Sequence, residues 1–164
     1  MKVNFAGNDF DLLGKELKVG DLVPNFTLVS NSLTPVSLKD TEGVRVFIAI
    51  PSLDTNICDL EVVTFNEKVS ELPHITVYTV SMDLPFAQAR WCANKGIKNV
   101  IALSDYKDRT FGQNFGVYIE EVGLLTRASF VVDSANIVTF VEYLPDVSLE
   151  PNYYDILEAA KAAK

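Results

Sequence analysis

The sequence predicts an α/β fold with a parallel strand–helix–strand core and an added antiparallel pair of strands. Three apolar, β-branched runs at residues 44–50, 75–81 and 100–103 alternate with helical patterns. Such runs are typical of parallel strands that helices cover on both faces. Two further strand patterns and a final helix, within residues 128–163, follow this core.

The N-terminal part is expected to add short strands to this core. Residues 3–5 and 10–12 flank Gly7-Asn8, a dipeptide of the kind that closes a β-hairpin. Residues 26–29 and 35–38 have the length and composition of two more short strands.

The first core unit joins a buried strand to a helix. Residues 44–50 form the strand, and Pro51 breaks it. Asp54 or Thr55 can cap the helix that follows, in which apolar residues recur at spacings of three and four until residue 72.

The second unit repeats this order. A strand over 75–81 is followed by Asp83, expected to cap a helix with Pro85 in its first turn. The helix runs through Cys92, and Gly96 is its expected stop signal.

The last third contains the remaining elements of the sheet. A strand over 100–103 precedes a short helix over 108–115. Strands over 128–132 and 137–143 form a hairpin, and a helix over 152–163 closes the chain. This order fits a thioredoxin-like sandwich, a central mixed sheet flanked by helices, with an N-terminal β-hairpin extension.

Length and composition limit the possible functions. The 164 residues are expected to form a single domain over 1–164. A formal net charge of −8 argues against nucleic acid and anionic lipid as partners. No apolar stretch is long enough to cross a membrane, and the first residues lack the apolar core of a signal peptide, so we expect a cytoplasmic protein.

The two cysteines are the candidate reactive groups. Cys58 falls in the first turn of a predicted helix, where free backbone N–H groups and the helix dipole stabilise a thiolate. Two cysteines in a reducing compartment indicate inert thiols, metal ligands or redox chemistry. Metal binding is the weakest of these, because only His74 could supplement the two thiols.

Three segments resemble the peroxiredoxins. Pro51, Thr55 and Cys58 reproduce the P-x-x-x-T-x-x-C signature of that family. Residues 83–92, ending in Cys92, and residues 125–133 look like corresponding segments of its thiol peroxidase branch, the atypical two-cysteine type. The similarity extends over nearly the whole chain.

The resemblance implies a role for five residues. Cys58 would be the peroxidatic nucleophile and Cys92 the resolving thiol. Thr55 would orient the thiolate and the peroxide, and Pro51 would shield the site from water. Arg127 would stabilise the thiolate and bind a peroxide oxygen.

Each of these residues also has a simpler interpretation. Thr55 could be a plain helix cap, Pro51 could merely end its strand, and Arg127 could be a solvated strand end. Cys58 could be an inert buried thiol, and Cys92 could be a small apolar residue on its helix. The acidic side chains near Cys58, Asp59 and Glu61, are more simply solvated helix charges, although the family pattern allows an acid near Glu61 to help hold the arginine.

The resemblance also implies a catalytic cycle. Hydrogen peroxide or an alkyl hydroperoxide would oxidise Cys58 to a sulfenic acid, which Cys92 would resolve as an intramolecular disulfide. Thioredoxin would reduce that disulfide. No metal, haem or flavin cofactor is implied, and the protein would be a homodimer.

A disulfide needs Cα atoms within about 7 Å, and cysteines on separate helices of such a fold are usually farther apart. The helices that carry the two cysteines are therefore expected to unwind locally.

Two rival functions remain open. A disulfide oxidoreductase of the same fold would normally use a Cys-x-x-Cys pair, which this chain lacks. A redox-sensing module would be oxidised once and would not turn over.

Overall fold

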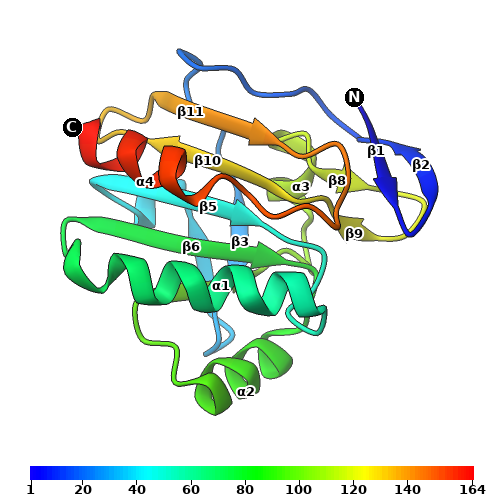
Figure 1. Ribbon diagram of the computed structural model, residues 1–164, viewed down its shortest axis with the longest axis horizontal. Helices are drawn as coiled ribbons and strands as arrows, with labels where there is room; N and C mark the ends of the chain where they lie inside the picture. Colours follow the sequence, from blue (N-terminus) through cyan, green and yellow to red (C-terminus); the bar gives the residue numbers. More distant parts are fainter.

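Seven strands form one mixed sheet at the centre of the computed structural model, which describes residues 1–164 (Figure 1). Across the sheet the strands are β11 (Val138–Tyr143), β10 (Ala128–Val132), β5 (Val44–Ala49), β6 (Ile75–Ser81), β7 (Val100–Ser104), β3 (Thr27–Val29) and β4 (Pro35–Ser37). The central strands β5, β6 and β7 are parallel, and the outer ones pair antiparallel. This confirms the predicted thioredoxin-like sandwich.

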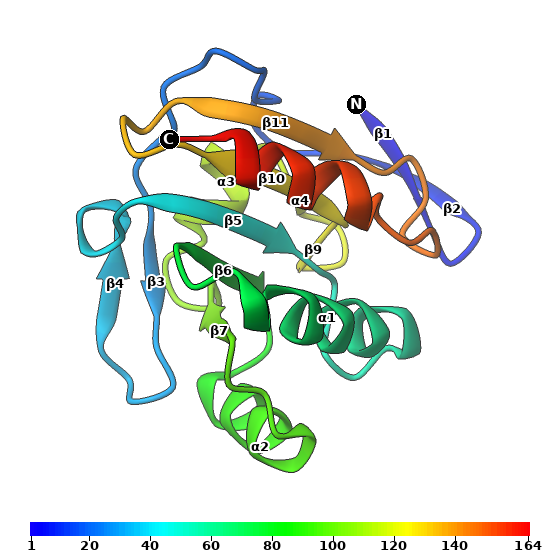
Figure 2. The same ribbon diagram turned by 60° about the vertical axis from the view of Figure 1, so that its left-hand side comes forward.

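Helices cover both faces of the sheet. They are α1 (Asn56–Lys68), α2 (Pro85–Lys95), α3 (Thr110–Asn114) and α4 (Tyr153–Ala162), with short 3₁₀ turns η1 (Leu38–Asp40) and η2 (Val69–Glu71). One apolar core joins the sheet to α1 and α4, and a second, rich in phenylalanine, joins the opposite face to α3. Helix α2 lies below α1 in both views and packs along β7 (Figure 2).

The N-terminal hairpin is confirmed, with its turn one residue earlier than expected. Strands β1 (Lys2–Phe5) and β2 (Asn8–Asp11) are joined by Ala6 and Gly7, whose φ angles are 52° and 84°. Two positive φ angles in succession suit the right-handed twist of a tight hairpin. Asn8 therefore belongs to the strand and not to the turn.

The helix ends agree with the sequence at most positions. Thr55 is the N-cap of α1, and Gly96 ends α2 in the left-handed conformation, with φ of 66°. Helix α1 ends at Lys68 and continues as η2, so the helical pattern up to residue 72 includes a change of winding. The pair β8 (Tyr118–Ile119) and β9 (Leu124–Leu125) was not predicted, because two-residue strands leave no pattern.

The expected capping of α2 by Asp83 is wrong. Leu84 is the N-cap residue and makes no side-chain cap. The Asp83 carboxylate instead accepts hydrogen bonds from Ser52 Oγ at 2.7 Å, Leu53 N at 2.8 Å and Ser81 Oγ at 2.8 Å. It thereby ties the loop before α1 to the loop before α2.

Candidate active site

The candidate site lies where β5 ends and α1 begins. Pro51 is buried just after the strand, and Cys58 lies in the first helical turn with no exposed surface. The Cys58 N–H donates to Thr55 Oγ1 at 3.2 Å, and the Thr55 hydroxyl donates to the Ser52 carbonyl at 3.2 Å. This geometry fixes the start of the helix and places the sulfur at its positive end.

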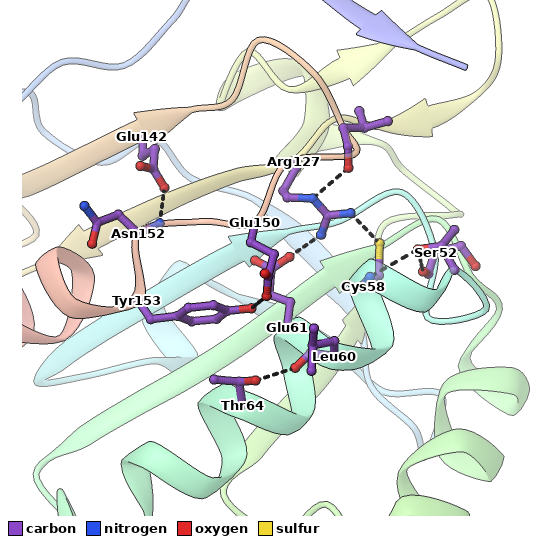
Figure 3. A network of polar contacts seen from close by, with 12 residues as sticks. Ser52, Cys58, Leu60, Glu61, Thr64, Arg127, Glu142, Glu150, Asn152 and Tyr153 are labelled. Carbon is purple, nitrogen blue, oxygen red and sulfur yellow. Dashed lines mark hydrogen bonds and ion pairs between the residues drawn. The ribbon is translucent and has the colours of Figure 1, made fainter. Parts of the chain in front are cut away.

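Arg127 reaches the same point from the neighbouring strand. It directly precedes β10, which pairs with β5, and its side chain is fully buried. One terminal nitrogen donates to Cys58 Sγ at 3.0 Å, and Nε donates to the Val147 carbonyl at 3.0 Å. The other terminal nitrogen forms an ion pair with Glu61 (Figure 3). The contacts with Val147 and Glu61 thus orient the guanidinium toward the sulfur.

The charges around Arg127 keep it ionised. Burial alone would lower the pKa of Arg127, but its electrostatic interactions and hydrogen bonds with Glu61 and Cys58 raise it above its ordinary value. The arginine therefore offers a permanent positive charge to the sulfur atom.

Burial of the Glu61 carboxylate carries a free-energy cost. It has no exposed surface, and one of its oxygens, Oε1, has no hydrogen-bond partner. Burial raises the pKa of Glu61 to about 7, although Arg127 opposes this by lowering it.

Helix α4 closes the far side of the Glu61 environment. The Tyr153 ring packs against Phe65 with centroids 5.2 Å apart, and its hydroxyl donates to Glu150 at 3.2 Å (Figure 3). Burial, together with the charges of Glu61 and Glu150, raises the pKa of Tyr153. This tyrosine stays protonated at neutral pH.

A cavity of about 370 Å³ opens beside this group. Thr55 and Arg127, the two partners of Cys58, both line it. Its other walls come from the N-terminal hairpin, the start of α1 and the loop after β11. These walls consist of Phe5, Ala6, Pro51, Asn56, Ile57, Val147 and Ser148.

Cys92 does not belong to this cavity. It is half-buried on α2 and lines a separate groove with Ile97 and Ile101. Both cysteines are free, and burial raises the pKa of the Cys92 thiol. Of the five residues singled out from the sequence, the structure thus brings together four, namely Pro51, Thr55, Cys58 and Arg127.

Comparison with known proteins identifies the family. Residues 18–157 match the family described as Redoxin. A thiol peroxidase of Clostridium acetobutylicum is 60% identical over 164 residues, covering 100% of both chains, and one of Bacillus subtilis is 48% identical over 162 residues, covering 98% of this chain and 97% of the relative. The chain belongs to the redoxin family.

Within the redoxins its curated relatives are thiol peroxidases, which confirms the resemblance found in the sequence. The protein is therefore a peroxidase, an enzyme of the oxidoreductase class. A peroxiredoxin-like protein of Aquifex aeolicus superposes with a TM-score of 0.91 at 38% identity, covering 98% of this chain and 95% of that one. A thiol peroxidase of Chromobacterium violaceum, at 22% identity, superposes with a TM-score of 0.89, covers 98% and 95% of the two chains, and supports the fold.

The residues singled out from the sequence do not include three parts of the redoxin site. The sequence favours a solvated helix charge for Glu61, and only the family pattern allows an acid there to hold the arginine. Glu61 nevertheless follows Cys58 by three residues and so shares its buried helix face. The Val147 carbonyl and the hairpin residues Phe5 and Ala6 come from distant segments, and no local signal marks them.

No group of three or more His, Cys, Asp or Glu side chains is placed to hold a metal ion. None of the helices is long and apolar enough to cross a membrane.

Proposed function

We propose that this redoxin reduces hydrogen peroxide and alkyl hydroperoxides through a Cys58 sulfenic acid. The observation that carries the proposal is the 3.0 Å hydrogen bond from the Arg127 guanidinium to Cys58 Sγ at the start of α1. A buried cation and a helix N-terminus both favour the thiolate, which is the nucleophilic form of cysteine.

In the first step the Cys58 thiolate attacks one oxygen of the peroxide. The S–O bond forms as the O–O bond breaks, and the other oxygen leaves with the electron pair and takes a proton as water or an alcohol. Arg127 and Thr55 line the cavity beside the sulfur, and the Arg127 N–H groups are suited to donate to the peroxide oxygens during this step. The Thr55 hydroxyl would donate to a peroxide oxygen after turning away from the Ser52 carbonyl.

The walls of the cavity support alkyl hydroperoxides as substrates in addition to hydrogen peroxide. Phe5, Ile57 and Val147 contribute apolar surface beside the polar groups of Thr55 and Arg127. An alkyl substituent would bury its surface against these side chains, whereas hydrogen peroxide has nothing to bury.

We assign the second step to Cys92. Its thiolate attacks the sulfenic sulfur of Cys58, hydroxide leaves and is protonated to water, and a disulfide forms. Because Cys58 is buried in the first turn of α1 and Cys92 lines a separate groove on α2, we infer that the first turn of α1 and the Cys92 segment of α2 unwind for this step.

The disulfide then needs two electrons from a dithiol. Thioredoxin is the proposed reductant, and a cytoplasmic location follows from the need for a reducing compartment. A homodimer is also proposed, on the resemblance to peroxiredoxins, and sedimentation of the purified protein would test it.

A thioredoxin-coupled peroxide assay tests the cycle. Wild type should consume reductant continuously, whereas a redox sensor would stop after one oxidation. Cys58→Ser should have no activity, because Ser Oγ is not ionised near neutral pH. Cys92→Ser should form one sulfenic acid per chain and then stop. Peroxide consumption by Cys58→Ser at the wild-type rate would refute the assignment.

A further inference from the structure

We propose that Asp59 is a positioning residue that holds α1 against α2 and sets the rate at which Cys92 resolves oxidised Cys58. This inference rests on the proposed function, because it assumes that Cys92 is the resolving thiol. Asp59 is not in the cavity beside Arg127, and the peroxide-reduction step described above does not use it.

The contact joins the immediate neighbours of the two cysteines. Asp59 follows Cys58, and Trp91 precedes Cys92. Asp59 Oδ1 accepts a hydrogen bond from Trp91 Nε1 at 2.8 Å. The same oxygen lies 3.4 Å from Lys95 Nζ, the last residue of α2.

These contacts are the only side-chain hydrogen bond and ion pair between α1 and α2. The other end of α1 is held differently. Asn66 Oδ1 accepts from the backbone N–H groups of Lys98 and Asn99, at 3.0 and 2.8 Å, in the loop after α2. Release of the Asp59 contacts would therefore loosen the cysteine end of α1 from α2 while its far end stays attached. Arg127 would still hold Cys58 and Glu61.

The environment suits a contact that must break in every cycle. The Asp59 side chain is 31% exposed and that of Lys95 is 46% exposed, so water can replace both partners at little cost. The Trp91 ring packs against the core under α1 and orients its N–H toward the carboxylate. The hydrogen bond to Trp91 is thus the stronger of the two contacts.

This geometry implies that Asp59 slows formation of the Cys58–Cys92 disulfide. The Cys58 sulfenic acid has two fates, a disulfide with Cys92 or further oxidation by a second peroxide to sulfinic acid. The disulfide requires the first turn of α1 to leave its place, and that movement requires the Asp59–Trp91 bond to open. Loss of the bond should speed disulfide formation and lower the yield of sulfinic acid.

Three variants and one control separate the contacts. Trp91→Phe keeps an aromatic ring, although a smaller one, and removes the N–H donor, while Asp59→Ala removes both contacts. Asp59→Asn keeps an acceptor for Trp91 and loses the attraction to Lys95. Glu67→Ala is the control, because Glu67 is an exposed acid on the same helix whose side chain makes no hydrogen bond or ion pair.

The test adds peroxide to reduced full-length protein and stops the reaction with a thiol-blocking reagent at successive times. Mass spectrometry then gives the sulfenic, disulfide and sulfinic forms. We expect Trp91→Phe and Asp59→Ala to form the disulfide about tenfold faster, the factor that a hydrogen bond to a charged acceptor supplies. Asp59→Asn keeps a weaker, neutral acceptor, so its rate of disulfide formation should fall between those of wild type and Asp59→Ala. Glu67→Ala should stay within about twofold of wild type.

Two further readouts separate positioning from general damage. The first oxidation of Cys58 should keep its rate within about threefold in all variants, which also shows that they are folded. Trp91 is the only tryptophan, so its fluorescence should change with the rate of disulfide formation in wild type and in the Asp59 variants.

Disulfide formation that is unchanged or slower in both Trp91→Phe and Asp59→Ala would overturn the role of Asp59. If Asp59→Ala does not fold, Trp91→Phe alone decides the question in the same way. Failure of wild type to form any Cys58–Cys92 disulfide would instead refute the proposed function.

Discussion

The buried carboxyl of Glu61 should make the stability of this redoxin depend on pH in an unusual direction. Glu61→Gln keeps an oxygen that can accept from Arg127 and removes the titratable group. Burial raises the pKa of Glu61 from 4.5 to about 7 in the folded protein. Between these values the folded state binds more protons than the unfolded state, so the contribution of Glu61 to stability falls as pH rises.

The size of the effect follows from that pKa difference. A tenfold change in proton affinity corresponds to about 1.4 kcal/mol, so the full contribution is about 3 kcal/mol. It is present below the unfolded pKa of 4.5 and is lost as pH rises through about 7. Between about pH 5 and about pH 8 the free energy of unfolding of Glu61→Gln, minus that of wild type, should increase by roughly 2–3 kcal/mol.

Urea denaturation of reduced protein at several pH values, followed by Trp91 fluorescence, measures this difference. Asp105, whose pKa burial raises to about 6, is present in both proteins, so its contribution cancels. Glu67→Gln, on the exposed face of the same helix, should show no such trend. A difference that is flat, or that decreases with pH, would show that attraction to Arg127 outweighs burial and would refute the reasoning.

Two further predictions concern the reaction itself. Arg127→Lys should lower the rate constant of Cys58 oxidation by about 10²–10³-fold, because one ammonium cannot reach the sulfur, Glu61 and the Val147 carbonyl together. Stopped-flow measurement of Cys58 oxidation tests this, and a loss below about threefold would contradict it. Phe5→Ala should raise KM for a bulky alkyl hydroperoxide several-fold and leave hydrogen peroxide reduction unchanged; equal effects on both substrates would argue against the cavity as the alkyl site.

Much of the fold could be predicted because its core strands carry strong local patterns. All six residues of β5 are buried and all but Arg45 are apolar, and a run of that kind has few alternatives. Asp83 shows where local reasoning fails. An acid before a helix normally caps it, but here Ser81 and Ser52 bind its carboxylate instead, and Ser52 lies within reach only in the folded chain.

The candidate site could be predicted only in part, for a related reason. Pro51, Thr55 and Cys58 lie in one short segment, so their spacing is itself a signal. The contact of Arg127 with Cys58 depends on the pairing of β10 beside β5, which only the resemblance to peroxiredoxins suggested. The Asp59–Trp91 bond depends on how two helices are rotated against each other, and no pattern in the sequence encodes that rotation.

The two carboxylates near Cys58 are therefore not interchangeable, although both belong to α1 and look alike in the sequence. Glu61 is fully buried, and its ion pair opposes a large desolvation penalty while orienting the arginine that faces the sulfur. Asp59 is partly exposed and can exchange its partners for water at little cost. A group that must stay in place throughout the reaction belongs in the interior, and a group that must release its partner in each cycle belongs at the surface. Exchanging the two environments would leave the thiolate without a fixed cation and the helices without a releasable contact.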